Sequence, residues 1–308
     1  MDILLYLLAL AAIQLIRLLP LPVVARLGRA GGMLFYWFDA RHRRVALRNL
    51  NRCFSSVISA KEIHGLAREN FRRIGENFAS AVKTSFMSPA DLKPYFEFVG
   101  AEKIAAFEHH PPQSRIVAIG HFGNFELYAR FGQFVPFFKC ATTYRGLRQP
   151  GLDRLMKSLR ERSGCYFYER RGDASVLKEA MSDTGLLLGL LADQHAGDNG
   201  ARLPFLGHEC STSTAPAIFA LRYGCPLHTA ICYRVKLAHW RIEVGDEIPT
   251  HSHGEARPIE EICTDINRAF EEAIRRDAAN WFWVHNRWKL AKSKRHKRRA
   301  APISAELA

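Results

Sequence analysis

Two polar side chains stand in an apolar stretch of the chain, at a spacing that suits proton transfer. His121 follows the apolar run Ile116–Ile119 and Gly120, and Glu126 comes five positions later, among phenylalanines. A carboxylate that accepts the Nδ1–H of an imidazole leaves Nε2 as a base, which can deprotonate an alcohol. The alternative is a buried His–Glu hydrogen bond without chemistry, and the spacing leaves both interpretations open.

Other common catalytic motifs are missing from the sequence. It contains no G-x-S-x-G, no Walker loop, no G-x-G-x-x-G and no H-E-x-x-H. The segment His251–His253 is polar and lacks a third ligand at metal spacing, so we interpret it as a solvated turn. The seven cysteines include no C-x-x-C pair, which favours free thiols in a reducing compartment. We therefore predict neither a metal site nor a resident cofactor.

Alternating strand and helix patterns beyond residue 100 must position these side chains. The predicted strands cover 116–119, 139–144, 165–168, 186–192, 227–233 and 240–244, and the predicted helices cover 124–134, 152–163, 174–181, 214–223 and 259–275. This order favours an α/β fold with a mixed, largely parallel sheet flanked by helices. His121, Arg145 and Asp193 each follow a predicted strand, at the sheet edge where ligands gather.

The first hundred residues have a different character. Residues 3–19 are mostly apolar and positive charges follow them, which predicts an N-terminal membrane anchor with the body of the protein on the cytoplasmic side. A buried or interfacial helix is the alternative, because the run is short for a spanning helix. We expect four segments: an anchor over 1–20, a helical membrane-proximal segment over 21–100, a catalytic domain over 101–290 and a basic disordered tail over 291–308.

The charge of the chain restricts the kind of partner. The formal net charge is +14, from 44 Lys and Arg against 30 Asp and Glu. Such an excess favours an anionic partner, which could be nucleic acid, anionic lipid or an acidic protein. No recognisable DNA- or RNA-binding module is present, so we do not expect nucleic acid to be the partner.

Five blocks of the sequence, in order, carry a family resemblance. The motif "GHFGNFELYA" (120–129) is similar to the H-x-x-x-x-D/E motif of the glycerolipid acyltransferase superfamily. It is closer still to the form found in the bacterial lipid A late acyltransferases, the lauroyl and myristoyl transferases. The other four blocks resemble the same family, and they are "ALRNLNRCF" (46–54), "TYRGLRQPGLDRLM" (143–156), the segment 186–227 with its Asp-Gln pair, and "NWFWVHNRWK" (280–289).

The resemblance implies a glycerolipid acyltransferase-like fold and a direct acyl transfer. The donor would be acyl-acyl carrier protein or acyl-CoA, and the acceptor a hydroxyl of a lipid A precursor. His121 would be the general base and Glu126 its orienting partner, with no covalent acyl-enzyme. Substrate contacts would come from Asn124, Arg145, Asp193 and Arg287. Arg145 would bind phosphate or developing negative charge, and Asp193 would position a substrate group or anchor Arg145. Arg287 would bind lipid phosphate together with Lys289.

The same resemblance implies which anionic partners the positive charge would attract. Acyl carrier protein, the phosphates of a lipid A precursor and the anionic lipids of the inner membrane would all prefer a basic face. We therefore expect an inner-membrane protein whose catalytic domain lies on the cytoplasmic face. Arg145 and Asp193 also have plain structural interpretations, a surface ion pair and a loop cap respectively.

Two departures from the family pattern leave the substrate preference open. The chain has Asp193-Gln194-His195 where the family usually has Asp-Gln-Asp, and Phe205-Leu206-Gly207 where it usually has Phe-Phe-Gly. One alternative is an acyltransferase acting on another glycolipid, an aminolipid or a lysophospholipid. A second is a non-catalytic, basic, membrane-anchored protein, and a thioesterase that uses water in place of the acceptor is a third.

Overall fold

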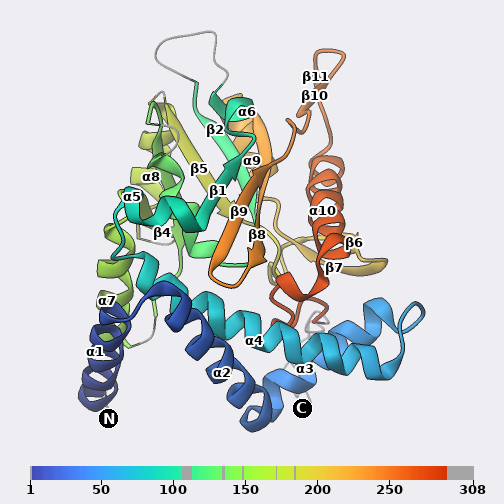
Figure 1. The fold of residues 1–308 in the computed structure, drawn as a ribbon. Helices are drawn as coiled ribbons and strands as arrows, with labels where there is room; N and C mark the ends of the chain where they lie inside the picture. The colour runs from blue at the N-terminus through green and yellow to red at the C-terminus, as the bar shows by residue number, and fades with distance from the viewer. Residues whose placement is uncertain are drawn as a thin grey trace, which may run out of the picture.

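The computed structural model of the chain describes residues 2–105, 113–133, 136–147, 149–170, 172–183 and 185–289. A seven-stranded sheet lies at its centre, in the order β1-β9-β8-β2-β5-β3-β4 (Figure 1). The strands are β1 (Phe96–Val99), β2 (Arg115–Ile119), β3 (Lys139–Tyr144), β4 (Tyr166–Glu169), β5 (Leu186–Leu191), β8 (Leu227–Lys236) and β9 (His239–Val244). The predicted tail over 291–308 lies outside the described residues.

The sheet is largely parallel, as predicted. Strands β4, β3, β5, β2 and β8 run in one direction, and β9 turns back beside β8, with β1 parallel to β9. The middle strand β2 is buried along its whole length, because its alternate side chains enter two separate cores. Ile116 and Ala118 belong to one core, and Val117 and Ile119 belong to the other.

Helices and short elements surround this sheet. They are α1 (Asp2–Leu18), α2 (Leu21–Phe38), α3 (Ala40–Phe54), α4 (Ala60–Thr84), α5 (Pro89–Leu92), α6 (Ala101–Ala105), α7 (Pro150–Glu161), α8 (Ala174–Ser182), α9 (Ala215–Tyr223) and α10 (Ile259–Arg276), with 3-10 helices η1 (Lys93–Tyr95), η2 (Phe125–Gln133) and η3 (Ala278–Asn280). Two hairpins, β6 (Ala201–Phe205) with β7 (His208–Thr212) and β10 (His251–Ser252) with β11 (Glu255–Ala256), complete the described elements.

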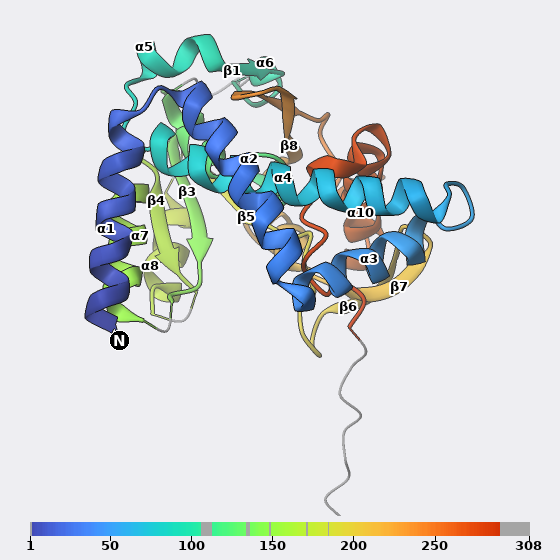
Figure 2. The same cartoon turned by 60° about the horizontal axis from the view of Figure 1, so that its bottom comes forward.

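The first four helices form a layer across one end of the sheet (Figures 1 and 2). Helices α2 and α4 pack closely where glycines meet, because a Cβ on Gly32 would overlap the backbone at Phe71. Helix α1 lies alongside α7, where the Tyr6 ring meets Gly151. A capping box of Ser59 and Glu62 starts α4.

Helix α1 occupies most of the predicted anchor, with apolar side chains on its exposed surface. Among the described residues, no helix combines the length and the apolar character that crossing a membrane requires. Anchoring by residues 3–19 therefore stays a prediction.

Most predicted elements beyond residue 100 are confirmed within about two residues of their ends. The exceptions are short. Strand β1, helix α6 and the two hairpins were not predicted, and the predicted helix over 124–134 is the 3-10 helix η2. All seven cysteines are free thiols, as expected, and the segment from His251 to His253 is an exposed hairpin turn.

Candidate active site

His121 and Asp193 are brought together by neighbouring parallel strands. Strand β2 pairs with β5 through Ile119 and Leu191, and the backbone N–H of Ala192 donates to the carbonyl of Ile119 at 3.0 Å. His121 leaves the end of β2 two residues later, and Asp193 leaves the end of β5. Both side chains therefore stand at the carboxyl edge of the sheet, where the predicted strand ends placed them.

The Asp193 carboxylate holds the His121 imidazole. Oδ1 accepts a hydrogen bond from Nδ1 at 2.8 Å, and Oδ2 accepts from the backbone N–H of His121 at 2.9 Å and from Nε1 of Trp281 at 2.8 Å. Asp193 is fully buried. Burial alone raises the pKa of this carboxyl, but the nearby imidazole and the hydrogen bonds from His121 and Trp281 outweigh it, so the pKa lies below its ordinary value.

This contact selects the form of the imidazole. With Nδ1–H donating to a carboxylate, Nε2 is left as the basic nitrogen. The structure gives Nε2 no hydrogen-bond partner within the described residues, and the imidazole is 16% exposed. His121 can therefore meet a ligand while its orientation is fixed from behind.

The last described segment of the chain supports this arrangement. Trp281 forms a β-bridge with Phe122, next to His121. The amide of Asn70 on α4 donates to the carbonyls of Ala279 and Trp281, and the amide of Asn49 on α3 donates to those of Trp283 and His285. The N-terminal helices thus hold the segment that positions Asp193.

Glu126 does not orient His121, which corrects the prediction. Its carboxylate pairs with Arg160 of α7, at 2.6 Å between Oε1 and Nη2 and 3.1 Å between Oε2 and Nε. The physical reason is the 3-10 helix η2, in which successive side chains diverge by about a third of a turn. Phe125 therefore packs against the imidazole, with ring centroids 4.8 Å apart, and Glu126 is turned away toward Arg160.

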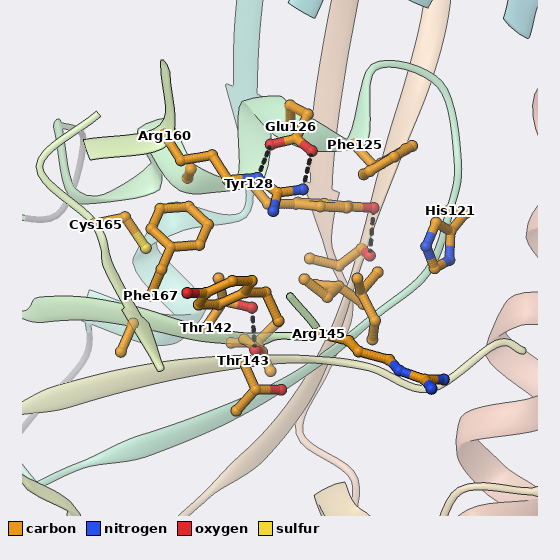
Figure 3. Close-up of a pocket in the computed structure, with 18 of the residues that line it drawn as sticks. His121, Phe125, Glu126, Tyr128, Thr142, Thr143, Arg145, Arg160, Cys165 and Phe167 are labelled. Carbon is orange, nitrogen blue, oxygen red and sulfur yellow. Dashed lines mark hydrogen bonds and ion pairs between the residues drawn. The ribbon is translucent and has the colours of Figure 1, made fainter. Parts of the chain in front are cut away.

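A cavity of about 560 Å³ opens between His121 and the face of the sheet. Its walls are mostly apolar and come from β2, β3, β5 and η2, while Glu126 and Arg160 contribute their ion pair (Figure 3). The thiols of Cys140 and Cys165 also line it, and burial raises the pKa of Cys140 to about 12. These thiols stay protonated at neutral pH and are poor nucleophiles.

Two of the predicted substrate contacts differ in position. Arg145 is exposed at the end of β3 and lines the cavity, and Figure 3 draws its guanidinium on the same side of the picture as His121. Asn124 is buried and does not line the cavity, although its side-chain amide finds no hydrogen-bond partner in the part of the chain that the structure describes. A direct contact of Asn124 with substrate is therefore not supported by its position.

The other two predicted contacts have structural partners. Asp193 holds His121 and does not bond to Arg145. Arg287 is fully buried, and its guanidinium donates to the carbonyl of Gln194 at 3.0 Å, to the carbonyl of Ser211 and to Thr212 Oγ1 at 3.0 Å. It supports the turn after Asp193, and this buried position does not support a contact of Arg287 with lipid phosphate.

Two histidines complete the lining near Asp193. The backbone N–H of His195 donates to Nε2 of His285 at 3.1 Å, and both residues line the cavity. Burial, helped by nearby positive charges, lowers the pKa of His285 to about 4. Sequence reasoning missed His285 as well as Arg160. The family blocks could have indicated both residues, because His285 lies within the block 280–289 and Arg160 follows the block 143–156.

Comparisons with known proteins identify the family of the chain. Residues 1–290 match the family model described as bacterial lipid A biosynthesis acyltransferase. The lipid A biosynthesis palmitoleoyltransferase of Escherichia coli (strain K12) is 25% identical over 280 residues, which cover 88% of this chain and 86% of the relative. The lipid A biosynthesis lauroyltransferase of the same organism is 28% identical over 172 residues, which cover 56% of this chain and 55% of the relative.

The match to the family model places the protein among acyltransferases, and it spans both the helical layer and the sheet. The chain belongs to the family of bacterial lipid A biosynthesis acyltransferases. This confirms the resemblance read from the five sequence blocks.

Proposed function

We propose that the protein transfers a fatty acyl chain from the thioester of acyl-acyl carrier protein to a hydroxyl of a lipid A precursor. The observation that carries the proposal is the His121–Asp193 pair at the edge of a large cavity whose walls combine apolar side chains with arginines. A base with a free Nε2 suits a hydroxyl acceptor, and an apolar cavity suits a hydrocarbon chain.

The reaction follows from these groups. Nε2 of His121 takes the proton of the acceptor hydroxyl while the hydroxyl oxygen attacks the thioester carbonyl carbon. The C–S bond then breaks, and the departing thiolate takes the proton from the imidazolium. Asp193 stays ionised and stabilises the imidazolium, so it acts as a positioning residue. The high pKa of the cavity thiol Cys140 favours this direct transfer over an acyl-enzyme.

The acyl chain would lie in the cavity along the sheet. Gly189 of β5 contributes to the floor, where a Cβ would lie 3.3 Å from the end of the Ile119 side chain. Glu126 keeps the Arg160 guanidinium in the cavity wall, and Arg145 provides a second cation at the rim. A guanidinium is suited to the negative charge that develops on the thioester oxygen, or to a phosphate of either substrate.

Association with the membrane is the second part of the proposal. The helical layer exposes apolar side chains from two helices, among them Leu7, Leu8 and Leu18 of α1 and Trp37 and Phe38 of α2. Arg41 and Arg44 are exposed at the start of α3, next to the aromatic end of α2. Aromatic and basic side chains together suit the headgroup region of an anionic bilayer, so α1 and α2 would lie in the membrane surface.

A vesicle experiment tests this part. In Leu8→Glu with Phe38→Glu, the fraction of protein that sediments with vesicles containing phosphatidylglycerol should fall strongly. Val57→Glu, at an exposed apolar position beyond α3, is the matched control and should bind as the wild type does. Unchanged binding of the double variant would remove α1 and α2 from the membrane contact.

Product analysis tests the reaction. Purified protein with mixed acyl-carrier-protein donors and a lipid A precursor should give an acylated lipid A product, detected by mass spectrometry. Transfer to lysophospholipid in place of the lipid A precursor would assign a different acceptor. Thioester hydrolysis without transfer to any lipid would make the protein a thioesterase.

A further inference from the structure

His121 faces two cavities. Besides the large cavity, the imidazole lines a shallow groove between α4 and the segment 279–282. The α4 wall of this groove includes Asn70, Arg73 and Phe78. Helix α4 crosses the end of the sheet (Figure 1), so one wall of the groove belongs to the helical layer.

Three aromatic rings cover the imidazole on this side. Ring centroids of Phe78 lie 6.0 Å from Phe125 and 6.2 Å from Phe282, both with edge-to-face geometry. Phe125 and Phe282 in turn lie 4.8 Å and 5.9 Å from the His121 ring. The three rings therefore form a connected aromatic cluster next to the base, which we call the aromatic gate and define by Phe78, Phe125 and Phe282.

The gate is closed but can move. The groove has a free volume of about 10 Å³, which is room for a single water molecule. Phe78 is 48% exposed on the surface of α4, so its ring can change rotamer without leaving a hole in either core. Opening the gate would extend the groove from the helical layer to the imidazole.

The charges of the groove indicate which part of a ligand it would take. Arg73 is already paired, with Glu69 at 3.1 Å and with Asp277 at 2.6 Å. A phosphate headgroup would have to displace these carboxylates, whereas a hydrocarbon chain would meet the three rings without cost to the ion pairs. The groove is therefore suited to an apolar chain whose hydroxyl reaches the base.

We propose that this groove admits the hydrocarbon portion of the lipid acceptor, and that Phe78, Phe125 and Phe282 are its gate. The inference rests on the proposed function, because the acyl chain of the donor would occupy the large cavity. A hydroxyl that attacks the thioester must then approach from another direction, to within about 3–3.5 Å of the carbonyl carbon. Donor and acceptor would thus reach His121 from its two sides.

Steady-state kinetics test the gate. In Phe78→Ala and Phe282→Ala, the KM for the lipid A precursor should rise by roughly 3- to 10-fold, which is the value of one aromatic contact. The KM for the acyl-acyl carrier protein donor should not change. Ile218→Ala, at an exposed apolar position on α9, is the matched control. Phe78→Leu keeps an apolar surface and should lie between the wild type and Phe78→Ala.

The outcomes separate the gate from other roles. A lower kcat with unchanged acceptor KM would mean that the rings only hold His121, which overturns the proposal. A higher donor KM would assign the groove to the donor and would also overturn it. Thermal unfolding of each variant shows that a kinetic change is not a loss of fold.

A capture experiment tests the gate independently of turnover. The full chain carries a photoreactive benzophenone side chain at position 78 or, as control, at position 218, and is irradiated in detergent with a lipid A precursor. Cross-linking at 78 and not at 218 supports the proposal, and equal or absent capture at 78 overturns it. If capture succeeds while no acyl transfer is found, the proposed reaction fails and the lipid groove stands.

Discussion

Asp193 and Glu126 belong to the same site but are held in opposite ways. Asp193 is fully buried, and fixed donors on His121 and Trp281 satisfy its two oxygens. Glu126 is 20% exposed in the wall of a cavity and pairs with the guanidinium of a long side chain, Arg160. A buried carboxylate with fixed donors is suited to orienting a base, while an ion pair in a cavity wall is suited to meeting a substrate. We therefore expect Asp193 to orient the base and Glu126 to keep a guanidinium where it can meet the substrate.

Loss of the base should have the largest effect. His121→Ala removes the group that takes the acceptor proton, so the initial rate of acyl transfer should fall by roughly 10²- to 10⁴-fold. The Tm should also fall, because the fully buried Asp193 carboxylate loses its imidazole partner, but the rate should fall much further than the loss of folded protein explains. If activity falls only as far as stability does, His121 has a structural role.

Loss of the orienting carboxylate should come next. Asp193→Asn places an amide N–H where the Nδ1–H of His121 has its acceptor, which favours the wrong tautomer. The rate should fall by roughly 10²- to 10³-fold, and His121→Ala with Asp193→Asn should be barely slower than His121→Ala alone. Losses that multiply would show that the two residues act independently, and would contradict the role of Asp193 in orienting His121.

Loss of the cavity ion pair should be smaller and should combine differently. Glu126→Gln weakens the hold on Arg160, and we expect a roughly 10-fold lower rate, which matches one charge-assisted hydrogen bond. Its coupling with Arg160→Lys should be strong, because Lys lacks the planar fork, and its coupling with Asp193→Asn should be weak. Double-mutant cycles of initial rates measure both couplings. Strong coupling of Glu126 to His121 would instead restore the pairing predicted from the sequence.

The smallest expected effect is a loss of stability at acid pH, which we attribute to His285 near Asp193. Burial lowers the pKa of His285 to about 4, so the unfolded chain binds this proton before the folded chain does. Stability should therefore fall as pH decreases from about 6.5 to about 4. His285→Gln can still accept from His195 and should raise the Tm at pH 5 by roughly 2–4 °C relative to wild type. Parallel melting curves at pH 5 and 7.5 measure this, and equal slopes for both proteins would assign the acid loss elsewhere.

The sequence predicted a residue's position where general rules of α/β folds apply to it. Buried apolar runs predicted the strands, and strand ends predicted that His121, Arg145 and Asp193 share one edge of the sheet. The partner of His121 was not predictable in the same way. Five residues of separation suit a contact if the chain turns back on itself, but η2 turns Glu126 toward Arg160. Which carboxylate reaches the imidazole depends on this local winding and on the distant Trp281.

Arg287 is a second residue whose environment could not be predicted from the sequence. A basic residue near the end of the chain suggested a phosphate ligand, and the charge alone gave no sign of its burial. Its donors instead bond to the carbonyl of Gln194, in the turn after Asp193, and to the carbonyl of Ser211 on β7, so the guanidinium ties these two segments together. Membrane association and the boundaries of the segments stay predictions, since they concern how the protein meets a bilayer.

The clamp made by Asn49 and Asn70 has a consequence for how the protein is made. These asparagines hold carbonyls that lie between 209 and 236 residues further along the chain, and the same segment supplies Trp281 to Asp193. Contacts of such separation form late in folding, because a long loop must close first. On the ribosome, α4 and the sheet can take shape while the imidazole still lacks its full support. The base should become competent only after the residues around position 285 have left the exit tunnel, so a nascent chain that has not yet exposed them would be inactive.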